Sequence, residues 1–304
     1  MFFPESQIAP VLRYETLIPA IRQALIDYSA GKVTQPPRPV LRVHDLEGVP
    51  SGWFAVMPVI AGEFMAVKTV TFFPGNTALG KHTHLAMIEL LDRATGEPLV
   101  VMDGRLITEM RTAAVSAVAA EALARPHAKT LGILGTGVQA RAHIEALRHV
   151  MPAFREQGVV RIWGRDPAKA ATIAEEMGAQ SVLIEEAAAC DVVVTVTSAK
   201  EPVLKGKWLR PESLVIAVGA VGPELRELDD EVMRGCLIAE SRQGAERESG
   251  DVLLSGAKVF AEIGEVLAGH ASPPPGRRIF KSLGMGVEDL TGAVVAWRAL
   301  RCVG

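Results

Sequence analysis

The sequence has few cysteines, and they are widely scattered. Cys190, Cys236 and Cys302 are the only three in 304 residues. An odd number at wide spacing predicts neither a disulfide framework nor a zinc cluster, and it fits a reducing cytoplasm. No apolar run is long enough for a transmembrane helix, and the first ten residues lack the basic flank and apolar stretch of a signal peptide. We therefore expect a cytoplasmic protein with no membrane partner.

A strong charge of either sign is also missing. Lysine and arginine total 32 against 35 acidic residues, a formal net charge of −3, so nothing suggests nucleic acid as a partner. The Gly-x-Ser-x-Gly motif of serine hydrolases and paired catalytic carboxylates at informative spacing are absent too. Because 49% of the residues are hydrophobic and 22% are charged, the chain reads as globular and long enough for two domains.

The pattern of apolar residues changes along the chain. Helical spacing over residues 14–28 gives way to strand-like segments over 53–103, and a helix rich in small residues is expected from about Thr108. From Lys129 short apolar runs alternate with helical segments, which is typical of a doubly wound parallel sheet. A last helix is predicted near the C-terminal end of the sequence.

These segments predict an α/β fold in which one domain is inserted into another. A Rossmann-type, dinucleotide-binding domain is expected over residues 119–281. A smaller α+β domain is expected to comprise residues 1–118 together with 282–304.

A glycine-rich turn separates the first strand of the expected Rossmann domain from its first helix. The turn comprises Gly135, Thr136, Gly137, Val138 and Gln139, followed by Ala140 in place of the third glycine. The first glycine permits a tight turn and the second lets backbone N–H groups approach a pyrophosphate at the helix N-terminus. In its strand–turn–helix context the motif predicts a dinucleotide site, although a plain strand-to-helix turn would share the pattern.

The end of the second strand bears on the choice of cofactor. Enzymes for NAD usually carry an acid there, which binds the ribose 2′-hydroxyl, whereas this chain has Gly164-Arg165-Asp166. Arginine binds phosphate well, so Arg165 favours NADPH. Asp166 leaves NADH open, and Arg165 would otherwise be an ordinary surface charge.

Three cations stand in unusual places. Lys68 alternates with apolar residues in a strand, which predicts either a cation at a pocket wall or a lysine on an edge strand. Arg111 is expected in the first turn of its helix, where it opposes the helix dipole unless an anion binds there; otherwise it is an exposed arginine. Arg38 lies in the stiff segment 36–39, and a solvated loop arginine is its simpler interpretation.

The motif His82-x-His84 lacks partners at a metal-binding spacing, so no metal is predicted. The residues alone thus indicate a pyridine-nucleotide oxidoreductase that acts on a small anion held by cations.

Several motifs resemble the ornithine cyclodeaminase and mu-crystallin family. They are WFAVMP, VMDGRLITEMRTAAVSAVAAEAL, LGILGTGVQA, ELDDEVM, ESGDVLLSG and FKSLGMGVEDL. The resemblance covers nearly the whole chain from about Pro36. It implies a homodimer whose N-terminal domain supplies both the substrate contacts and the subunit interface. It also implies that Arg38, Lys68 and Arg111 hold the substrate carboxylate.

The resemblance also implies the cofactor contacts. Gly135 to Gln139 would carry the cofactor, with Arg111 and Thr112 beside it and Thr112 near the pyrophosphate. Arg165 would lie at the adenosine end, Thr197 on the nicotinamide side, and His84 beside the cofactor.

Two positions depart from the family members that deaminate ornithine. Those members have an acid where this chain has Ala55, and an aspartate for the distal amine where it has Val221. A valine cannot bind an ammonium, and leaving that amine buried and unpaired would cost on the order of 1–3 kcal/mol. The resemblance therefore favours a substrate without a distal amine.

We accordingly expect a reductase of cyclic imine carboxylates, Δ1-pyrroline-2-carboxylate or Δ1-piperideine-2-carboxylate, with Lys68 as the candidate catalytic residue. The alternatives are an amino-acid dehydrogenase that takes a keto acid and an amine, an ornithine cyclodeaminase, and a carrier of small carboxylates with little turnover.

Overall fold

The computed structural model describes residues 1–303 and divides into two compact units. Unit 1 comprises Met1–Arg111 and the chain from Met285 onward, and unit 2 comprises Thr112–Gly284. The boundaries expected from the sequence were after residues 118 and 281. No helix within residues 1–303 combines the length and the apolar character needed to cross a membrane.

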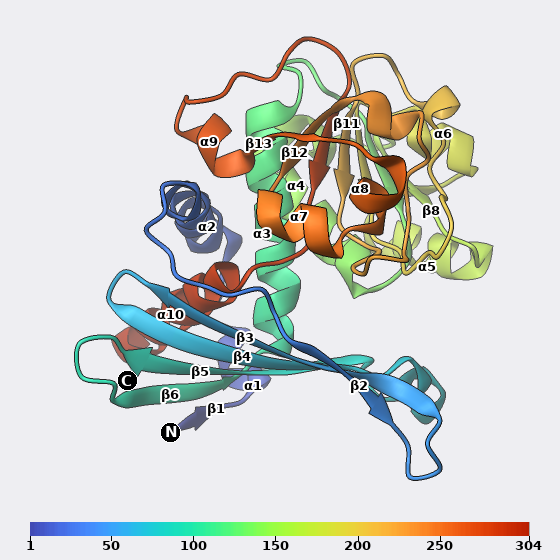
Figure 1. Ribbon diagram of the computed structural model, residues 1–304. Coiled ribbons are helices and arrows are strands. Elements are labelled where there is room, and N and C mark those ends of the chain that lie inside the picture. Colours follow the sequence, from blue (N-terminus) through green and yellow to red (C-terminus); the bar gives the residue numbers. More distant parts are fainter. Residues whose placement is uncertain (304) are drawn as a thin grey trace. The chain divides into compact units, whose positions relative to one another are not determined.

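Unit 1 is built on a six-stranded sheet in the order β1-β6-β5-β4-β3-β2 (Figure 1). Its neighbours pair antiparallel, except that β1 runs parallel to β6. The strands are β1 (Phe2–Phe3), β2 (Val40–His44), β3 (Pro50–Ala61), β4 (Phe64–Phe72), β5 (His84–Asp92) and β6 (Pro98–Asp103).

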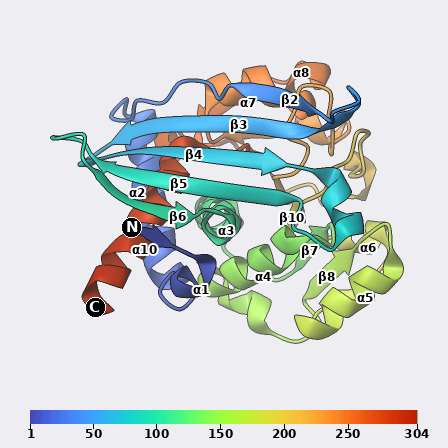
Figure 2. The same ribbon diagram turned by 90° about the horizontal axis from the view of Figure 1, so that it is seen from below.

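Helices cover one face of this sheet, as Figure 2 shows from the opposite side. They are α1 (Glu5–Ile8), α2 (Tyr14–Ser29) and α10 (Gly286–Val303), and a short 3-10 turn, η1 (Pro74–Leu79), follows β4. The last helix, α10, packs on α2 and on strands β3, β4 and β5. The inner residues of the strands are therefore buried, and they alternate with outward-facing residues as the pleat requires.

The helix α3 (Arg105–Leu123) runs from unit 1 into unit 2. It begins three residues before the expected position, Thr108, because the Asp103 carboxylate accepts a hydrogen bond from the Arg105 N–H at 2.9 Å. A side chain that accepts from the first amides of a helix favours a start at that point. The sequence pattern missed this start because Arg105 and Leu106 precede the run of small residues.

Unit 2 contains an eight-stranded parallel sheet in the order β13-β12-β14-β11-β10-β7-β8-β9. The strands are β7 (Leu131–Leu134), β8 (Val160–Trp163), β9 (Gln180–Ser181), β10 (Val192–Thr195), β11 (Leu214–Ala217), β12 (Cys236–Ala239), β13 (Val259–Glu262) and β14 (Arg278–Lys281). The order reverses between β7 and β10, which is the switch point where doubly wound sheets bind ligands. The predicted fold class, a doubly wound sheet inserted into a smaller α+β unit, is confirmed.

Short helices connect the strands of unit 2. They are α4 (Val138–Val150), η2 (Pro152–Arg155), α5 (Pro167–Glu176), α6 (Ile184–Ala188), η3 (Gly206–Trp208), η4 (Val232–Arg234), α7 (Arg242–Glu248), α8 (Gly250–Ser255) and α9 (Ile263–Leu267). The central strands β7, β10 and β11 are buried at every position. Burial on both faces explains why these strands read as continuous apolar runs.

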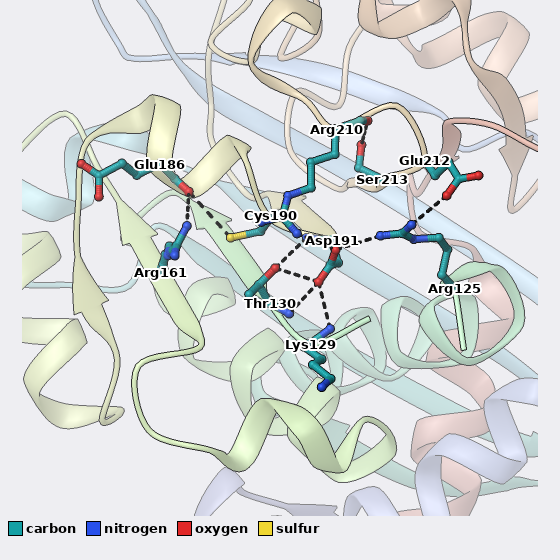
Figure 3. Close-up of polar contacts among 10 residues, drawn as sticks. All are labelled: Arg125, Lys129, Thr130, Arg161, Glu186, Cys190, Asp191, Arg210, Glu212 and Ser213. Atoms are coloured by element: carbon teal, nitrogen blue, oxygen red, sulfur yellow. Dashed lines mark hydrogen bonds and ion pairs between the residues drawn. The ribbon is translucent and has the colours of Figure 1, made fainter. Parts of the chain in front are cut away.

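A buried aspartate joins the strands at the amino-terminal edge of this sheet (Figure 3). Asp191, directly before β10, accepts hydrogen bonds from the N–H groups of Lys129 and Thr130 at 2.9 and 3.0 Å and from the Thr130 hydroxyl at 2.9 Å. Its other oxygen pairs with Arg210 at 2.7 Å and Arg125 at 3.1 Å. These contacts fix the starts of β7 and β10 relative to each other.

The same contacts set the protonation of Asp191. Burial raises the pKa of this carboxyl, but the hydrogen bonds from Lys129, Thr130 and Arg210 outweigh burial and lower the pKa to about 2. Because the folded pKa lies below the ordinary 3.8, the carboxylate stabilises the fold above pH 4, and this contribution disappears as the pH falls from about 4 to 2.

We therefore expect Asp191→Asn to lower the free energy of unfolding at pH 7 by about 2 kcal/mol. Urea unfolding of both proteins should show the difference shrinking as the pH falls below 4. Asp230→Asn, at a 71% exposed aspartate that pairs with Arg226, is the control and should change stability by less than about 0.5 kcal/mol. An Asp191→Asn difference that stays constant down to pH 2 would contradict this assignment.

Candidate functional site

Lys68 lies in the middle of the sheet of unit 1. Its strand, β4, is flanked by β3 and β5. Met57 of β3 and Ile88 of β5 are the direct cross-strand neighbours of Lys68. Its side chain is 2% exposed. The interpretation as an edge-strand lysine is therefore wrong, because β4 is an interior strand and Lys68 is buried. A buried ammonium requires a partner.

That partner is Asp289, in the first turn of α10. The Lys68 Nζ lies 2.6 Å from Asp289 Oδ2, and Arg111 Nε lies 2.9 Å from Asp289 Oδ1. Arg111 also pairs with the adjacent Glu288. One aspartate thus bridges two cations, and all four side chains are buried.

Arg111 does not lie where the sequence placed it. Since α3 begins at Arg105, Arg111 is in the second turn, beyond the reach of the helix dipole. Only 5% of the residue is exposed. Both expectations, opposition to the dipole and an exposed side chain, are wrong, and pairing with Glu288 and Asp289 is what stabilises the cation.

Two glycines let α10 approach its neighbours closely enough to form these pairs. A Cβ on Gly292 would lie 2.7 Å from the Ile107 side chain of α3, and one on Gly286 would lie 3.2 Å from Val59 of β3. At the start of α10 the Gln35 side chain accepts a hydrogen bond from the Val287 N–H at 3.0 Å. Gln35 thereby ties the proline-rich segment to the same end of the helix.

Arg38 belongs to that proline-rich segment, which lies along β3. The carbonyl of Pro39 accepts a hydrogen bond from the Val56 N–H at 3.3 Å. Arg38 is half-buried, and its positive charge contributes to lowering the pKa of Lys68. A fully solvated loop arginine is therefore not what the structure contains. Arg38 and Arg111, far apart in sequence, thus both lie within electrostatic reach of Lys68 in unit 1.

The surroundings of Lys68 make its ammonium unusually acidic. Burial lowers its pKa most, the Asp289 carboxylate raises it, and the charges of Arg111 and Arg38 lower it further. The resulting pKa is about 8 rather than 10.5. Lys68 is thus charged at neutral pH but close to the point at which it releases a proton, as a general acid requires.

His84 lies on the same face of the sheet as Lys68, because rows of cross-strand neighbours alternate between faces. It forms a row of rings with Phe72 and Trp53, with centroid distances of 4.4 Å and 5.5 Å. Packing against neighbours lowers its pKa, and the Lys68 charge lowers it further, so the imidazole is neutral at pH 7. Within the described part of the chain, no three His, Cys, Asp or Glu residues form a metal-binding group.

Cations gather in this part of unit 1. Arg38, Lys68 and Arg111 lie there with the acids Glu288 and Asp289. Such cations suit a small anion, and each charge-assisted hydrogen bond to a carboxylate would contribute roughly 1.5–3 kcal/mol.

In unit 2 the glycine turn has the shape that a pyrophosphate needs. Gly135 has a φ of +131°, and a Cβ there would lie 2.6 Å from the Val196 carbonyl oxygen. A Cβ on Gly137 would meet no heavy atom of the described chain within 4 Å. Among the described side chains none caps α4, which begins at Val138. The first N–H groups of α4, including that of Gln139, thus fit a phosphate group.

The end of β8 is shaped by the same turn. A Cβ on Gly164 would lie 2.4 Å from the Thr136 side chain, so glycine is required there. Arg165 follows and is exposed. Asp166 caps α5, accepting hydrogen bonds from the N–H groups of Ala168 and Lys169 at 3.0 and 3.3 Å.

The other predicted cofactor residues lie at different points of unit 2. Thr197 lies just beyond the carboxyl end of β10, and its N–H and hydroxyl both donate to Glu227 at 2.7 Å. Thr112 is buried in α3, at the first position of unit 2. Together with the glycine turn, Thr197 lies at the carboxyl edge of the sheet, where doubly wound sheets bind ligands.

Sequence reasoning missed a buried histidine that joins α3 to α4. His143 Nδ1 donates to the Gln139 carbonyl at 2.7 Å, and Nε2 lies 2.9 Å from Ser116 Oγ. Burial lowers the pKa of His143 to about 4, so its ring is neutral. No spacing signal in the sequence marks this pair.

Glu288 and Asp289 were also missed, although they lie inside a motif that carried the family resemblance. The available signal was two adjacent acids in the first turn of an otherwise apolar last helix. Acids are common at a helix N-terminus because the helix dipole stabilises them. This ordinary explanation concealed their role as partners of the buried cations.

We expect Asp289→Asn to lower the free energy of unfolding by about 3 kcal/mol at pH 7, because it leaves Lys68 and Arg111 buried with one anion fewer. Urea unfolding monitored by circular dichroism measures the change. Glu63→Gln, which breaks the exposed pair of Glu63 with Arg298 at 3.5 Å, is the matched control and should change stability little. Equal effects of the two substitutions would show that the buried pair does not support the fold.

Comparison with known proteins places this geometry in a family. The family model described as "Ornithine cyclodeaminase/mu-crystallin family" matches residues 1–300. The chain is similar to the ketimine reductase mu-crystallin of Mus musculus, with 41% identity over 97% of this chain and 96% of the relative.

Solved structures agree. A Δ1-pyrroline-2-carboxylate reductase from Thermococcus litoralis, in complex with NADH and L-proline, superposes with a TM-score of 0.92 and 32% identity over 100% of this chain and 98% of that one. An archaeal alanine dehydrogenase dimer with bound NAD has a TM-score of 0.91 and 28% identity over 100% and 96%. The resemblance found in the sequence is thus confirmed, and the chain belongs to the ornithine cyclodeaminase/mu-crystallin family.

Proposed function

We propose that this chain is an NAD(P)H-dependent oxidoreductase that reduces the C=N bond of cyclic imine carboxylates. The substrates would be Δ1-pyrroline-2-carboxylate and Δ1-piperideine-2-carboxylate, and the products L-proline and L-pipecolate. The observation that carries the proposal is the gathering of Arg38, Lys68 and Arg111 in unit 1, with Lys68 and Arg111 buried against Asp289. The ketimine and pyrroline-2-carboxylate reductases among its relatives support it.

The residues of unit 1 have two tasks in this reaction. Arg38 and Arg111 would hold the substrate carboxylate, and Lys68 would orient it and supply a proton to the imine nitrogen. A bound reduced nicotinamide supplies the hydride that the imine carbon accepts, so one hydride and one proton convert C=N into CH–NH. Fixing the orientation of the carboxylate is where much of the rate should arise.

Cofactor choice follows from the end of β8. Asp166 caps α5, and the preceding Arg165 is an exposed charge beside the glycine turn that caps no helix. A guanidinium there suits a 2′-phosphate, so we propose that NADPH is preferred and NADH accepted. The relatives solved with NADH and NAD support the acceptance of the unphosphorylated form.

Cyclodeamination of ornithine is less well supported. Ala55 is buried in β3 on the face of Lys68 and offers no polar group, and Val221, 43% exposed, offers none either. A substrate ammonium would have neither acid to bind. Amino-acid dehydrogenation remains the second candidate because one similar structure is that of an alanine dehydrogenase.

The test is a panel of substrates assayed by the absorbance of NADPH and of NADH. We expect the two cyclic imines to be reduced at least tenfold faster than pyruvate with ammonia or methylamine, and ornithine to release no ammonia. Lys68→Met should lower kcat by 100-fold or more, within the range for loss of a general acid, with little change in cofactor affinity. For the unmodified protein kcat should fall as the pH rises through about 8, because Lys68 then loses its proton.

Arg298→Met, at an exposed pair on α10, controls for loss of a positive charge in unit 1. Faster turnover of pyruvate with ammonia would favour the dehydrogenase, and cofactor oxidation at background with every substrate would favour a carrier. Unchanged turnover in Lys68→Met would remove the proposed role of Lys68.

We also propose that the chain forms a homodimer through the outer face of the unit 1 sheet, the face turned toward the viewer in Figure 2. Helices cover the inner face, whereas Leu41, Leu85 and Met87 on the outer face are 60%, 47% and 51% exposed. An apolar sheet face of this kind is typical of subunit interfaces. The dimeric alanine dehydrogenase supports this assignment.

Met87→Lys should therefore convert a dimer into a monomer, as measured by sedimentation velocity, because a charge would be buried in the interface. Leu79→Lys, at a 68% exposed position in the 3-10 turn η1 rather than on a strand, should leave the dimer intact. A Met87→Lys protein that still sediments as a dimer would place the interface elsewhere.

A further inference from the structure

A buried glutamate lies at the carboxyl edge of the unit 2 sheet and has no place in the function proposed above. Glu227 follows β11 in sequence and is 0% exposed. Its carboxylate accepts three hydrogen bonds: from the Thr195 hydroxyl at 2.8 Å, and from the N–H and hydroxyl of Thr197 at 2.7 Å each. Three donors directed at one carboxylate stabilise its ionised form.

The neighbouring charges leave Glu227 without a cation of its own. Lys281, at the end of β14, donates to Asp251 at 3.0 Å and to the Gly219 carbonyl at 2.8 Å. Asp251 in turn accepts from the N–H groups of Glu227 and Leu228 at 2.9 Å each. The Lys281–Asp251 pair is neutral, so an ionised Glu227 gives this buried cluster of described side chains one negative charge in excess. Lys281 and the threonines lower the pKa of Glu227, but burial outweighs them and raises it above its ordinary value.

Glu227 lies next to the loops that follow β10 and β11. A Cβ on Gly219 would lie 2.0 Å from the Thr197 carbonyl oxygen and 2.6 Å from Glu227 Oε1. Because Gly219 has no side chain, the Glu227 carboxylate can lie directly against these loops. Ligands of doubly wound sheets bind outside such strand ends, and Thr197 is the residue that the family resemblance sets on the nicotinamide side.

We propose that Glu227 is a positioning residue that acts through Thr197 and through its own negative charge. It strengthens binding of the oxidised cofactor more than binding of the reduced cofactor, which an uncharged residue would not do. This inference rests on the proposed function as a nicotinamide-dependent enzyme. The reduced nicotinamide ring is neutral and the oxidised ring carries a positive charge. When a hydride passes to the imine carbon, the charge that develops on the ring would meet the unbalanced anion of Glu227, and Glu227 itself exchanges no proton. Such an arrangement lowers the barrier to hydride donation.

The test measures binding rather than turnover. The dissociation constants of NAD⁺ and NADH, and of NADP⁺ and NADPH, are determined separately by calorimetry for the unmodified protein and for Glu227→Gln. We expect Glu227→Gln to weaken binding of the oxidised form by on the order of tenfold more than that of the reduced form, as the loss of one buried charge at intermediate dielectric predicts. Equal weakening of both forms would overturn the proposal and leave Glu227 a structural role only.

Thr195→Val is the matched control, because it removes one hydrogen bond to Glu227 but keeps the charge. Its effect on the two forms of the cofactor should be equal. If Glu227→Gln does not fold, infrared spectra of the unmodified protein at pH 7 provide the answer: the band of a buried protonated carboxylic acid with either form of the cofactor would overturn the proposal, and its absence with both forms supports it.

The outcome is separable from that of the proposed function. A protein that binds both forms of the cofactor but reduces no imine overturns the proposed function and still reports the ratio that tests Glu227. A protein that binds neither form overturns both.

Discussion

The contact on which unit 1 depends is the bridge from Asp289 to Lys68 and Arg111. An ammonium in the centre of a sheet and a guanidinium inside a helix packing would each be costly to bury alone. Asp289 makes both tolerable by offering one carboxylate oxygen to each. The close approach of α10 at Gly292 and Gly286 follows from this need, because a wider spacing would break the bridge.

The two units show opposite electrostatic designs. In unit 1 three cations, Arg38, Lys68 and Arg111, gather around two acids. In unit 2 a single lysine, Lys281, pairs with Asp251 near a second buried acid, Glu227, at the carboxyl edge of the sheet. Apart from the half-buried Arg38, these residues are buried, so water screens their charges little.

Much of this could be read from the sequence, and the reasons are physical. The short strands β7, β10 and β11 are buried on both faces, so their composition alone identified a parallel sheet. The glycine turn was recognisable because backbone geometry fixes the residue type at Gly135. The fold class and the family were therefore predictable, and the three candidate cations were found because each is unusual in its own local surroundings.

The sequence did not reveal which acid forms an ion pair with which cation. Lys68 and Asp289 are more than two hundred residues apart, and no local spacing records their pairing. The helix start at Arg105 was missed for a related reason: the Asp103 carboxylate fixes it, and periodicity detects apolar faces rather than caps. Glu227 was likewise invisible, because its partners Thr195 and Thr197 meet it only through the folding of the sheet.

The arrangement of the chain also has a consequence for its synthesis. Unit 2 occupies the continuous stretch from Thr112 to Gly284, whereas unit 1 is closed by α10, which comes last. A ribosome therefore releases a complete unit 2 while the sheet of unit 1 still lacks one of its covering helices and the acids of that helix. Until α10 emerges, Lys68 and Arg111 lack their partners Glu288 and Asp289. Translation that stops short of α10 leaves part of the apolar sheet face uncovered, and chaperones and proteases would recognise such a chain.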